Sequence, residues 1–571
     1  MAFSSLPSVL MAQADRLGTR SALRFKKYGL FHTFSWQDYA DDAWACATAL
    51  ASCGIAFGDR VGLLSENRLE WLLGDMGIMT AGAINVPLHA PLTAQQIQFQ
   101  LAETEAKFAF VSTAAQLEKL KQVLHELPAL QGIVTFDGVS SSPNDNLLGS
   151  NVNLMSWDGF LQKGRNEHNR LAAEIAGRVR SLNLDSLATI MYTSGTTGNP
   201  KGVMLTHGNL LSNATASLKV QPLDPEDLVL NWLPLSHIYA RTVDYYETMI
   251  GGIELVLAES AETVIENIQE VQPTHVASVP RLYEKILAAC ATPDPEMTKK
   301  RVRAIFGRRI KRLSSGGAAL PVPIETPFQN AGLPLYQGYG LTESSPVISF
   351  NRPDANRVGT VGLPLPGVEI KIGPDGEVLA RGPNIMKGYW RNPQASAEAL
   401  HDGWLLTGDL GKIDADGFLS ITGRKKELMV LSNGKKLIPS FVEGLLVADD
   451  CIDQAAIFGE GKNYLSALIV PQWDLVRKTL REQGNDLASI SPNEMTTMPE
   501  VVNLLRQRID KRLAEVSPWE QVKKFVILSE PFSIAKEELT VSLKLRREVV
   551  VAHNAKTLEA LYSNNSKDAS D

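Results

Sequence analysis

The chain has 571 residues, of which 44% are hydrophobic and 21% are charged. This composition is typical of a globular protein, and at roughly 100 to 200 residues per domain the length predicts three or four compact units rather than a lone binding module. The formal net charge of −7 gives no general case for nucleic-acid binding. The four cysteines form no C-x-x-C pair and no zinc-ligand pattern, so we expect a reduced, cytoplasmic compartment.

No segment has the pattern of a targeting or membrane-spanning sequence. The apolar stretch at the N-terminus is short and is interrupted by Ser and Pro, which is not typical of a signal peptide. No window approaches about 18 uncharged apolar residues. We therefore expect a protein that is soluble or at most associated with a membrane surface.

The first part of the chain alternates apolar runs of strand length with segments of helical periodicity. From Phe34 to about Val111, runs such as RVGLLSEN and INVPL flank the segment EWLLGDMGIMTAGA. This alternation predicts βαβ units around a parallel sheet. The polar stretch 137–153 predicts a surface loop, because helix and strand patterns resume on both sides of it.

A second βα series is predicted between Leu187 and Phe350. Its strand candidates include IELVLA, HVASVP and KRLSSGG, and ligands in such folds bind at the carboxyl ends of the strands. Beyond Arg352, short strands punctuated by Gly and Pro predict a small distorted barrel. Mixed helices and strands resume from Lys435, and the polar end of the chain predicts a disordered tail. The predicted fold class is α/β, with a large N-terminal region of stacked βα sheets and a small barrel, followed by a small α+β domain.

The segment 299–312 is strongly basic, since eight of its fourteen residues are Lys or Arg. Apolar residues fall between the charges at helical spacing: Val302, Ile305, Phe306, Ile310 and Leu313. This spacing predicts one amphipathic helix, whose simplest interpretation is a solvated face with an apolar underside. The alternative is a docking patch for an acidic lipid or a phosphorylated ligand, which would bring the protein to a membrane surface.

The most informative segment is MYTSGTTGNPKGVMLTHGN, residues 191–209. An apolar strand runs into a loop in which glycines let backbone N–H groups turn toward an anion, hydroxyls add donors, and Lys201 supplies a positive charge. The loop residues are Thr193, Ser194, Gly195, Thr196, Thr197 and Gly198. This is not a Walker A loop, because Pro200 precedes the lysine and Gly202 follows it. The segment therefore predicts a different kind of phosphate-binding loop.

This segment resembles the phosphate-loop signature of the adenylate-forming superfamily, which includes acyl-CoA synthetases, adenylation domains and luciferases. Six further signatures follow in that family's order. They are LPLSH (233–237), SSGGAAL (314–320), YGLTE (339–343), TGD (407–409), GRKKE (423–427) and LTVSLKLRR (539–547). The resemblance covers nearly the whole chain. It implies a reaction in which AMP from ATP is joined to a carboxylate before the acyl group is transferred.

The resemblance also assigns roles to residues that would bind ATP and magnesium. Glu343 and Thr193 would hold Mg²⁺ on the phosphates of ATP. The adenine side would be formed by Gly316, Gly317, Ala318, Gln337, Gly338 and Tyr339, with Thr342 also at the nucleotide. Asp409 would accept both ribose hydroxyls, and Arg424 and Ile421 would complete the ribose wall. Ordinary turns would also explain the glycines and the aspartate.

Three further residues are implied to be catalytic: Lys544, Lys201 and His237. Lys544 matches the lysine that bridges the substrate carboxylate and the α-phosphate during adenylation, although Val541 stands where long-chain members usually show Pro. The alternative for Lys544 is one more solvated lysine in a basic segment. His237 falls beside the bound carboxylate in the family, whereas a lone histidine is more often structural.

Members of the family rotate a small C-terminal domain between adenylation and thioester formation. The resemblance implies an N-terminal domain over 1–425, a mobile domain over 426–560 and a disordered tail over 561–571. Lys426 matches the hinge. Gly434, beside Lys435, falls where the family lets the pantetheine arm of CoA pass, and the alternative is a plain hairpin turn.

The identity of the acid is indicated by a residue type that is missing. Relatives that activate amino acids carry an aspartate for the substrate ammonium in a segment comparable to 233–243, and this chain has no acidic residue there. The strings LPLSHIYAR, VPRLYEKI and LSNGKKLIP look like the long-chain fatty acyl-CoA synthetase branch. The stretch 287–313 is shorter than the helical insertion of many members of that branch, which leaves the chain-length preference open.

The sequence therefore predicts an enzyme that uses ATP and Mg²⁺ to convert a fatty acid to acyl-AMP, with release of pyrophosphate, and then transfers the acyl group to CoA. Two alternatives within the superfamily are a fatty acyl-AMP ligase and a ligase that joins an aryl or other acid to CoA. An alternative of another class is a non-catalytic homologue used as a binding scaffold. The predicted partners are fatty acid, ATP and CoA, without nucleic acid, and the oligomeric state stays open.

Overall fold

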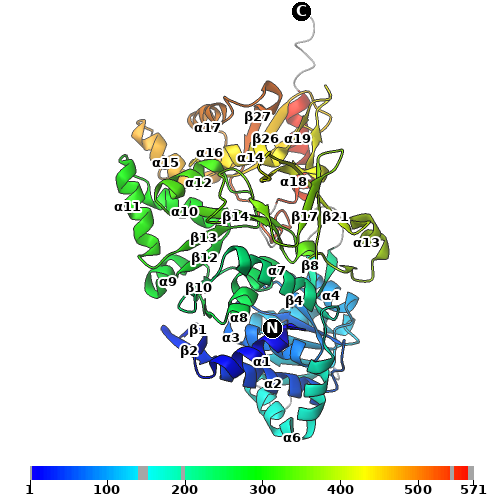
Figure 1. Ribbon diagram of the computed structural model, residues 1–571. Helices are drawn as coiled ribbons and strands as arrows, with labels where there is room; N and C mark the ends of the chain where they lie inside the picture. The colour runs from blue at the N-terminus through cyan, green and yellow to red at the C-terminus, as the bar shows by residue number, and fades with distance from the viewer. Residues whose placement is uncertain (1–2, 139–151, 194–199, 486, 541–544, 564–571) are drawn as a thin grey trace, which may run out of the picture. The chain divides into compact units, whose positions relative to one another are not determined.

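The structure is a computed structural model that describes residues 3–138, 152–193, 200–485, 487–540 and 545–563 (Figure 1). The chain divides into two compact units. The larger unit contains residues 1–373, 378–407 and 413–420, and the smaller unit contains residues 374–377, 408–412 and 421–571. The predicted loop 137–153 falls largely outside the described residues.

One sheet of the larger unit has eight strands in the order β19-β9-β8-β4-β3-β5-β6-β7. Its strands are β3 (Arg60–Leu64), β4 (Ile84–Leu88), β5 (Phe108–Val111), β6 (Gly132–Thr135), β7 (Asn153–Ser156), β8 (Leu187–Thr193), β9 (Lys201–Thr206) and β19 (Gly388–Tyr389). The strands from β8 to β7 are parallel, whereas β9 is antiparallel to both β8 and β19. Helices α3 (Leu69–Thr80) and α4 (Ala94–Glu103) connect β3 to β4 and β4 to β5, which confirms the predicted βαβ units.

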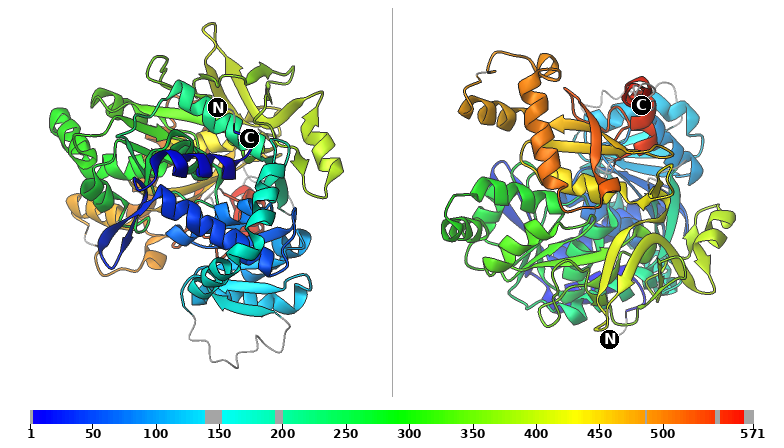
Figure 2. Two further views of the ribbon diagram at one scale, coloured as in Figure 1. Left: turned by 60° about the horizontal axis from the view of Figure 1, so that its bottom comes forward. Right: turned by 90° about the horizontal axis from the view of Figure 1, so that it is seen from above.

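The second sheet has nine strands in the order β16-β15-β14-β13-β12-β10-β11-β1-β2. Its strands are β1 (Ser21–Lys27), β2 (Leu30–Ser35), β10 (Leu228–Asn231), β11 (Glu254–Leu257), β12 (His275–Ser278), β13 (Arg312–Ser315), β14 (Leu335–Gly340), β15 (Val347–Phe350) and β16 (Leu363–Pro364). The strands from β14 to β1 are parallel, and the three predicted strand segments correspond to β11, β12 and β13. The β1–β2 hairpin forms one edge, where Figure 2 shows it projecting in dark blue.

The two largest hydrophobic cores of this unit pack against these sheets. The first core packs residues of both sheets with α1 (Leu6–Leu17), α2 (Trp36–Ser52), α3 and α7 (His207–Val220). The second core covers the nine-stranded sheet with α9 (Val264–Val271), α10 (Pro280–Cys290), α11 (Pro295–Phe306) and α12 (Val322–Asn330). Further helices of this unit are α5 (Ala114–Val123), α6 (Trp157–Ser181), a π-helix (Ala240–Tyr246) and α8 (Glu247–Gly251).

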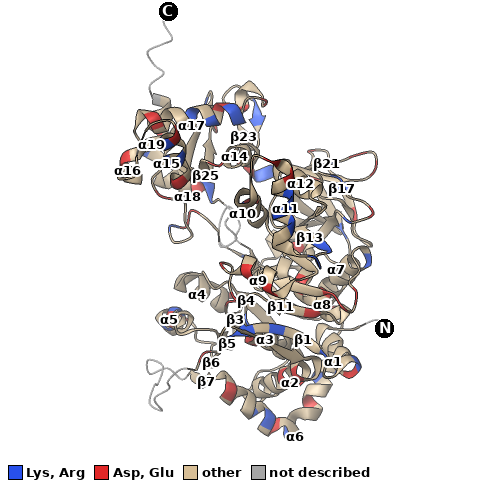
Figure 3. Ribbon diagram, turned by 90° about the vertical axis from the view of Figure 1, so that its left-hand side faces the viewer, with Lys and Arg blue, Asp and Glu red and all other residues tan. Residues whose placement is uncertain are grey.

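The single helix predicted over 299–312 is wrong at its C-terminal end. Helix α11 ends at Phe306, because Gly307 at φ 73° caps it and donates its N–H to Arg303. The chain then enters β13 at Arg312, so Ile310 and Leu313 are not on the helix. Figure 3 shows Lys and Arg along α11. The segment is therefore a basic helix followed by a basic loop.

The region after Arg352, predicted as a small distorted barrel, is a five-stranded sheet in the order β17-β18-β21-β20, with β22 paired to β21. Its strands are β17 (Glu369–Ile372), β18 (Glu377–Arg381), β20 (Leu400–His401), β21 (Trp404–Ile413) and β22 (Leu419–Arg424), and α13 (Pro393–Ala399) precedes β20. Segments of this sheet belong to both units.

The rest of the smaller unit is built on a three-stranded sheet of β25 (Ile452–Phe458), β26 (Leu465–Pro471) and β27 (Val522–Ile527). A separate hairpin of β23 (Met429–Val430) and β24 (Lys436–Leu437) precedes this sheet in the chain. Alternate residues of β25 and β26 enter two different cores. The helices are α14 (Pro439–Val447), α15 (Trp473–Glu482), α16 (Pro492–Met495), α17 (Pro499–Arg512), α18 (Arg547–His553) and α19 (Ala555–Ser563).

The disordered tail predicted over 561–571 starts within a helix of the structure. Residues 561–563 belong to α19, because the Tyr562 ring stacks on Tyr464 at 5.0 Å and its hydroxyl lies 2.7 Å from the hydroxyl of Ser466. The remainder of the tail, 564–571, lies outside the described residues. Across the part of the chain that the structure describes, no helix is both long enough and apolar enough to cross a membrane.

Candidate active site

The predicted phosphate loop connects β8 to β9. Residues 194–199, which include Ser194, Gly195, Thr196, Thr197 and Gly198, lie outside the described residues. The two ends of the loop are described: Thr193, the last residue of β8, pairs with Lys201, the first residue of β9. The antiparallel pairing therefore holds the predicted hydroxyl and ammonium groups at the same end of one hairpin.

Tyr389 connects Lys201 to Glu343. The Lys201 ammonium lies 5.0 Å from the centroid of the Tyr389 ring, and the Tyr389 hydroxyl donates a hydrogen bond of 2.9 Å to Glu343 Oε1. The backbone N–H of Met386 also donates to the carbonyl oxygen of Glu343, at 2.8 Å. Burial and the Glu343 carboxylate raise the pKa of Tyr389 far above its ordinary value, so the hydroxyl keeps its proton. Three residues from two distant signatures, Thr193, Lys201 and Glu343, are thus brought together through a tyrosine that no sequence motif indicated.

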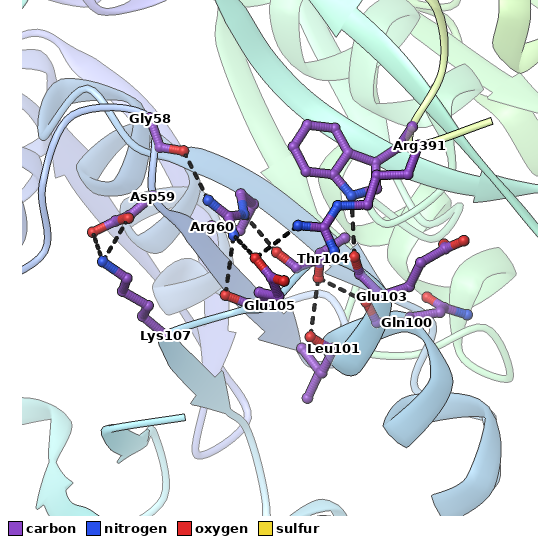
Figure 4. Close-up of polar contacts among 11 residues, drawn as sticks. Gly58, Asp59, Arg60, Gln100, Leu101, Glu103, Thr104, Glu105, Lys107 and Arg391 are labelled. Carbon is purple, nitrogen blue, oxygen red and sulfur yellow. Dashed lines mark hydrogen bonds and ion pairs between the residues drawn. The ribbon is translucent and has the colours of Figure 1, made fainter. Parts of the chain in front are cut away.

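The strand that bears Tyr389 is held by its neighbours on both sides. Trp390 donates its backbone N–H to Gly202 at 2.7 Å and its indole N–H to the carbonyl of Glu103 at 3.1 Å. The guanidinium groups of Arg60 and Arg391 lie 5.6 and 5.7 Å from the Trp390 ring. Figure 4 shows both arginines reaching Glu105, at 3.3 Å from Arg60 and 2.7 Å from Arg391. These contacts fix β19 beside β9 and so fix the position of Tyr389.

The oxygen donors near this strand fit a magnesium ion. Mg²⁺ prefers hard oxygen ligands and is usually held by one or two carboxylates together with phosphate and water oxygens. The Glu343 carboxylate and the Thr193 hydroxyl are donors of this kind. Among the described residues no three His, Cys, Asp or Glu side chains lie close enough to hold a metal by themselves, so phosphate oxygens would have to complete the shell.

The predicted adenine side is formed where β13 and β14 end. Ser315 pairs with Gln337 across these parallel strands, and the N–H of Gly316 donates to the carbonyl of Ser278 at 3.0 Å. A Cβ atom at Gly338 would lie 2.6 Å from the Phe350 ring, so any larger residue here would have to displace that ring. Gly317 adopts φ 77°, which also favours glycine. The predicted segments therefore meet at the carboxyl edge of the sheet.

The remaining nucleotide residues follow from the same strands. Ala318 is exposed beyond Gly317, Tyr339 is half-buried in β14, and Thr342 begins the short 3₁₀ turn (Thr342–Ser344) that carries Glu343. This turn follows β14 directly in the chain. Gln337, Gly338 and Tyr339 of the predicted adenine side and Glu343, predicted to bind the metal, are thus held by one strand and its turn.

The acid side contains a second histidine that the sequence did not indicate. His89 follows β4, and its Nδ1 lies 2.7 Å from the Ser236 hydroxyl, while its ring centroid lies 6.3 Å from that of His237. Burial lowers the pKa of His89 to about 4, so the ring is neutral at physiological pH. His237 is half-buried and its Nδ1 accepts the backbone N–H of Tyr239 at 3.3 Å. The LPLSH segment is therefore anchored to the neighbouring sheet by His89.

The π-helix that follows LPLSH is tied to the phosphate-loop strand by a buried ion pair. Arg241 pairs with Asp75 of α3 and donates to the hydroxyl of Thr189 in β8 at 2.9 Å. Asp75 also accepts the Tyr246 hydroxyl at 3.0 Å. Asp75 and Arg241 are both fully buried, so removal of either would leave an unpaired charge in the core. The segment of the predicted acid site is thereby held against β8.

The predicted ribose residues lie together in the smaller unit. Asp409 on β21 is buried, and its carboxylate oxygen Oδ1 forms an ion pair with Nε of Arg424 on β22 at 2.8 Å. Ile421 lies on the same strand as Arg424. The structure thus brings Asp409 and Arg424 into contact.

The predicted hinge and CoA residues are surface features of the smaller unit. Lys426 is exposed in a 3₁₀ turn (Lys425–Glu427), and Lys425 beside it pairs with Asp375 at 2.5 Å. Gly434, at φ 77°, forms the turn of the β23–β24 hairpin, and the Lys435 ammonium lies 4.6 Å from the Trp519 ring. Lys544 and Val541 lie outside the described residues.

Comparison with known proteins identifies the family. The family model described as AMP-binding enzyme matches residues 10–390, and the model of the AMP-binding enzyme C-terminal domain matches residues 426–566. The chain belongs to the AMP-binding enzyme family. The resemblance seen in the sequence is therefore confirmed.

Relatives of this AMP-binding enzyme include acid–CoA ligases. The chain is 31% identical to the long-chain-fatty-acid–CoA ligase FadD15 of Mycobacterium bovis, over 94% of this chain and 93% of that protein. It is 28% identical to the long-chain-fatty-acid–CoA ligase ACSBG2 of Xenopus laevis, over 98% of this chain and 84% of that protein.

Solved structures share the fold. The anthranilate CoA ligase AuaEII in complex with anthranoyl-AMP matches with a TM-score of 0.77 at 20% identity, over 98% of this chain and 99% of that chain. The adenylation domain of a carboxylate reductase from Mycobacterium chelonae matches with a TM-score of 0.80 at 22% identity, over 98% of this chain and 91% of that chain. The predicted fold class is therefore confirmed.

This AMP-binding enzyme is an acid–CoA ligase that uses ATP, Mg²⁺ and CoA. A free carboxylate is a poor acyl donor, because its leaving group would be oxide. Transfer of AMP to the carboxylate creates a mixed anhydride with a good leaving group, and the developing charge on the phosphates calls for nearby cations. Lys201 is a cation at the end of the predicted phosphate loop, and the predicted role of the Glu343 and Thr193 oxygens is to hold Mg²⁺.

Proposed function

We propose that the preferred acids of this ligase are long-chain fatty acids. In the first step the fatty acid carboxylate attacks the α-phosphorus of ATP, which gives acyl-AMP and releases pyrophosphate. In the second step the CoA thiolate attacks the acyl carbon, the thioester forms, and AMP leaves. The relatives that carry long-chain fatty acid names match nearly the whole chain, which supports this choice of acid.

The observation that carries the proposal is an apolar wall beside the predicted nucleotide segment. Leu233, Tyr239, Ala240 and Ala277 form a buried cluster, against which Trp232, Val243 and Val279 pack. A Cβ atom at Gly316 would lie 2.9 Å from the Tyr239 ring, so this wall adjoins SSGGAAL directly. An apolar wall that begins at LPLSH suits an alkyl chain better than an ammonium group.

The nearest acidic residue after LPLSH is already engaged. Asp244 is buried and accepts the side-chain N–H of Asn231 at 2.9 Å, and burial raises its pKa to about 7. A carboxylate held in this way is a structural partner rather than a counter-ion for a substrate ammonium. This arrangement argues against an amino acid as the substrate.

The proposed roles of the site residues follow from their charges and positions. Lys201 would bind the β- and γ-phosphates, with Ser194, Gly195, Thr196, Thr197 and Gly198 of the loop. Mg²⁺, when bound by Glu343 and Thr193, supplies charge neutralisation on the phosphates. Lys544 would bridge the substrate carboxylate and the α-phosphate, His237 would lie beside that carboxylate, and Gly434 with Lys435 would line the path of CoA.

The proposal is tested by a pyrophosphate-release screen with purified enzyme, ATP and Mg²⁺. The acids tested are saturated fatty acids of increasing length, aryl acids and amino acids, each with and without CoA. We expect the largest kcat/KM for long-chain acids, with acyl-CoA and AMP as products by mass spectrometry.

Each part of the proposal has its own contrary result. A preference for aryl or short acids would contradict the choice of acid and leave the ligase activity standing. Acyl-AMP that accumulates and is not consumed when CoA is added would contradict CoA as the acceptor.

A further inference from the structure

The tip of the β1–β2 hairpin exposes two large apolar side chains. Tyr28 is 92% exposed and Leu30 is 69% exposed, the two highest values for large apolar residues in the described part of the chain. Lys27 pairs with Leu30, so Tyr28 and Gly29 form a two-residue turn with φ values of 53° and 77°. Turns of this kind favour Asn, Asp or Gly at the first position, and an aromatic side chain there is disfavoured. The turn therefore presents an apolar group to the surroundings where a small polar one would be more stable.

The second observation is the solvent face of α11. Val302 and Phe306 are buried against the sheet, whereas Lys300, Arg301 and Arg303 are exposed. Met297 is 44% exposed. Ala304 lies two helical turns further along the same solvent-facing side of α11, and Lys300 and Arg301 flank the line between these two residues. Arg308 and Arg309 extend the basic surface beyond the end of the helix. This face combines a narrow apolar line with flanking cations.

These two features lie on one side of the larger unit. Both the β1–β2 hairpin and α11 are at the left margin of Figure 1, and Figure 3 turns that side toward the reader. Helix α9 connects them, because Lys26 of the hairpin pairs with Glu270 of α9 at 2.9 Å and α9 shares a hydrophobic core with α11. We call this surface the basic face and define it as the turn 27–30, the exposed side of α11 and the loop 308–309.

The basic face carries a local excess of positive charge on a chain with a net charge of −7. Among the described residues, six exposed cations of this face have no ion-pair partner: Lys27, Lys300, Arg301, Arg303, Arg308 and Arg309. Four exposed carboxylates of the described residues near this face also have none: Glu262, Glu266, Asp294 and Glu226, whose backbone carbonyl accepts from Arg309. The six unpaired cations therefore outnumber the four unpaired carboxylates near this face.

We propose that the basic face docks on a bilayer surface rich in anionic lipid. Lys and Arg side chains are attracted to anionic headgroups, and a tyrosine with an adjacent leucine suits the boundary between headgroups and acyl chains. A combination of an apolar tip with a polybasic patch gives reversible attachment, which neither signal provides well alone. The surface would give the enzyme access to acids that partition into the membrane, although docking itself needs no substrate.

The experiment measures sedimentation of the full chain with vesicles, without acid, ATP or CoA. One set of vesicles is phosphatidylcholine, and in the other about a third of the lipid is phosphatidylglycerol. We expect at least about tenfold tighter binding to the anionic vesicles, and the binding should weaken at least tenfold when salt is raised to about 1 M. Equal binding to both sets, or no effect of salt, would overturn the proposal. These measurements use the natural sequence, so they do not depend on the folding of any variant.

Two variants with matched controls locate the contact. The variant K300E/R301E/R308E should lower binding to anionic vesicles about tenfold, whereas R20E/K163E/K219E, which makes the same charge change at exposed positions elsewhere in the unit, should change it less than about twofold. The variant Y28S/L30S should weaken binding severalfold, whereas Leu184→Ser, at a residue that is 49% exposed, should not. Equal losses in variants and controls would overturn the proposal.

Two further outcomes name other partners. Displacement of the anionic vesicles by millimolar inorganic phosphate would identify a site for a small phosphorylated ligand instead of a bilayer surface. Absence of vesicle binding together with salt-sensitive binding to an acidic polypeptide such as polyglutamate would identify a protein partner. Either outcome would overturn docking on lipid. Since no substrate is present, failure here leaves the proposed acid preference untouched.

Discussion

Tyr389 contacts two of the predicted ATP-binding signatures, one through its hydroxyl and the other through its ring. Its O–H group donates to Glu343, and its ring lies against the Lys201 ammonium. A hydrogen bond to a charged group contributes about 1.5–3 kcal/mol, and loss of the donor also frees the carboxylate to turn. Tyr389 therefore acts as a positioning residue for Glu343.

We predict that Tyr389→Phe lowers kcat/KM for ATP about 10- to 100-fold, because the carboxylate that would hold Mg²⁺ loses its orientation. The titration of activity with Mg²⁺ should shift to higher concentration, which a purely structural role of the tyrosine would not cause. The exposed Tyr28 offers the control, and Tyr28→Phe should leave both quantities unchanged in solution. An unchanged Mg²⁺ requirement in Tyr389→Phe would refute the positioning role.

Glu247 makes the stability of the fold depend on pH. It is buried in α8, and burial raises its pKa to about 8, whereas an unfolded glutamate titrates near pH 4.3. The folded chain therefore binds this proton more tightly than the unfolded chain, so the carboxyl lowers stability as pH rises from about 4 to about 8. Below the lower value both states are protonated and the effect vanishes.

We predict that Glu247→Gln makes the melting temperature fall less between pH 6 and pH 9 than it does in the natural protein, because glutamine does not titrate. The exposed Glu226→Gln variant should keep the natural pH dependence. Thermal unfolding at a series of pH values measures both. If Glu247→Gln keeps the full decline, another buried group such as Asp244 causes it.

Lys544 is proposed to act in one half-reaction only. A lysine that stabilises developing charge between the carboxylate and the α-phosphate contributes to adenylation, so Lys544→Ala should slow acyl-AMP formation about 10²- to 10³-fold. Thioester formation from supplied acyl-AMP should be much less affected. The exposed Lys556→Ala serves as a control and should leave both rates near the natural values. Comparable losses in the two half-reactions would argue against this assignment.

At the scale of elements, the contact between α2 and α6 depends on one glycine. A Cβ atom at Gly164 of α6 would lie 1.9 Å from the carbonyl oxygen of Ala45 in α2. Backbone atoms cannot give way as a flexible side chain can, so any side chain at this position must separate the helices. Gly177 lies on the same helix and has no atom within 4 Å of a Cβ built there.

We predict opposite effects for alanine at these two glycines. Gly164→Ala should lower the free energy of unfolding by about 1–3 kcal/mol because it overpacks the helix contact. Gly177→Ala should raise it by up to about 1 kcal/mol, because alanine is the better helix former. Denaturant unfolding of the two variants gives the comparison directly. A Gly164→Ala variant as stable as Gly177→Ala would show that the helices can move apart at little cost.

At the scale of the whole molecule, the chain divides into two units and the proposed hinge lies near the division. All residues from Ile421 onward belong to the smaller unit, and Lys426 lies five residues later in an exposed turn. A short exposed turn can absorb the dihedral change of a rigid-body movement. Asp409 and Arg424 both precede Lys426 in the chain, so a rotation at Lys426 would leave this ion pair intact.

We predict that Lys426→Pro separates the two half-reactions. Proline fixes φ near −65° and removes a backbone donor, so a rotation through this residue would be blocked. Single-turnover formation of acyl-AMP should persist, whereas multiple-turnover production of acyl-CoA should fall by orders of magnitude. Lys426→Ala keeps the backbone free and should retain most of the turnover. Thioester production near the natural rate in Lys426→Pro would place the hinge elsewhere or exclude domain alternation.

Several features of this protein could be predicted from the sequence by itself. The parallel strands β3, β4, β11, β12 and β13 were predicted because a strand buried on both faces is a continuous apolar run, which is a local property. The family was predicted because each signature is a contiguous string of residues. Such strings and their order along the chain can be recognised without knowledge of the tertiary structure. Two such strings also placed Asp409 and Arg424 at one predicted site, and the two side chains form an ion pair.

Only the tertiary structure decided which distant segments touch. The contacts of Tyr389 with Glu343 and of His89 with Ser236, and the buried pair of Asp75 with Arg241, join residues brought together by the order and register of strands. Neither the periodicity of one segment nor a signature determines the order of the strands. That order depends on the way in which many short segments pack together into common hydrophobic cores. The helix over 299–312 was mispredicted for a local reason, because Gly307 caps α11 at Phe306, and only the pairing of Arg312 and Leu313 with β12 is a tertiary effect.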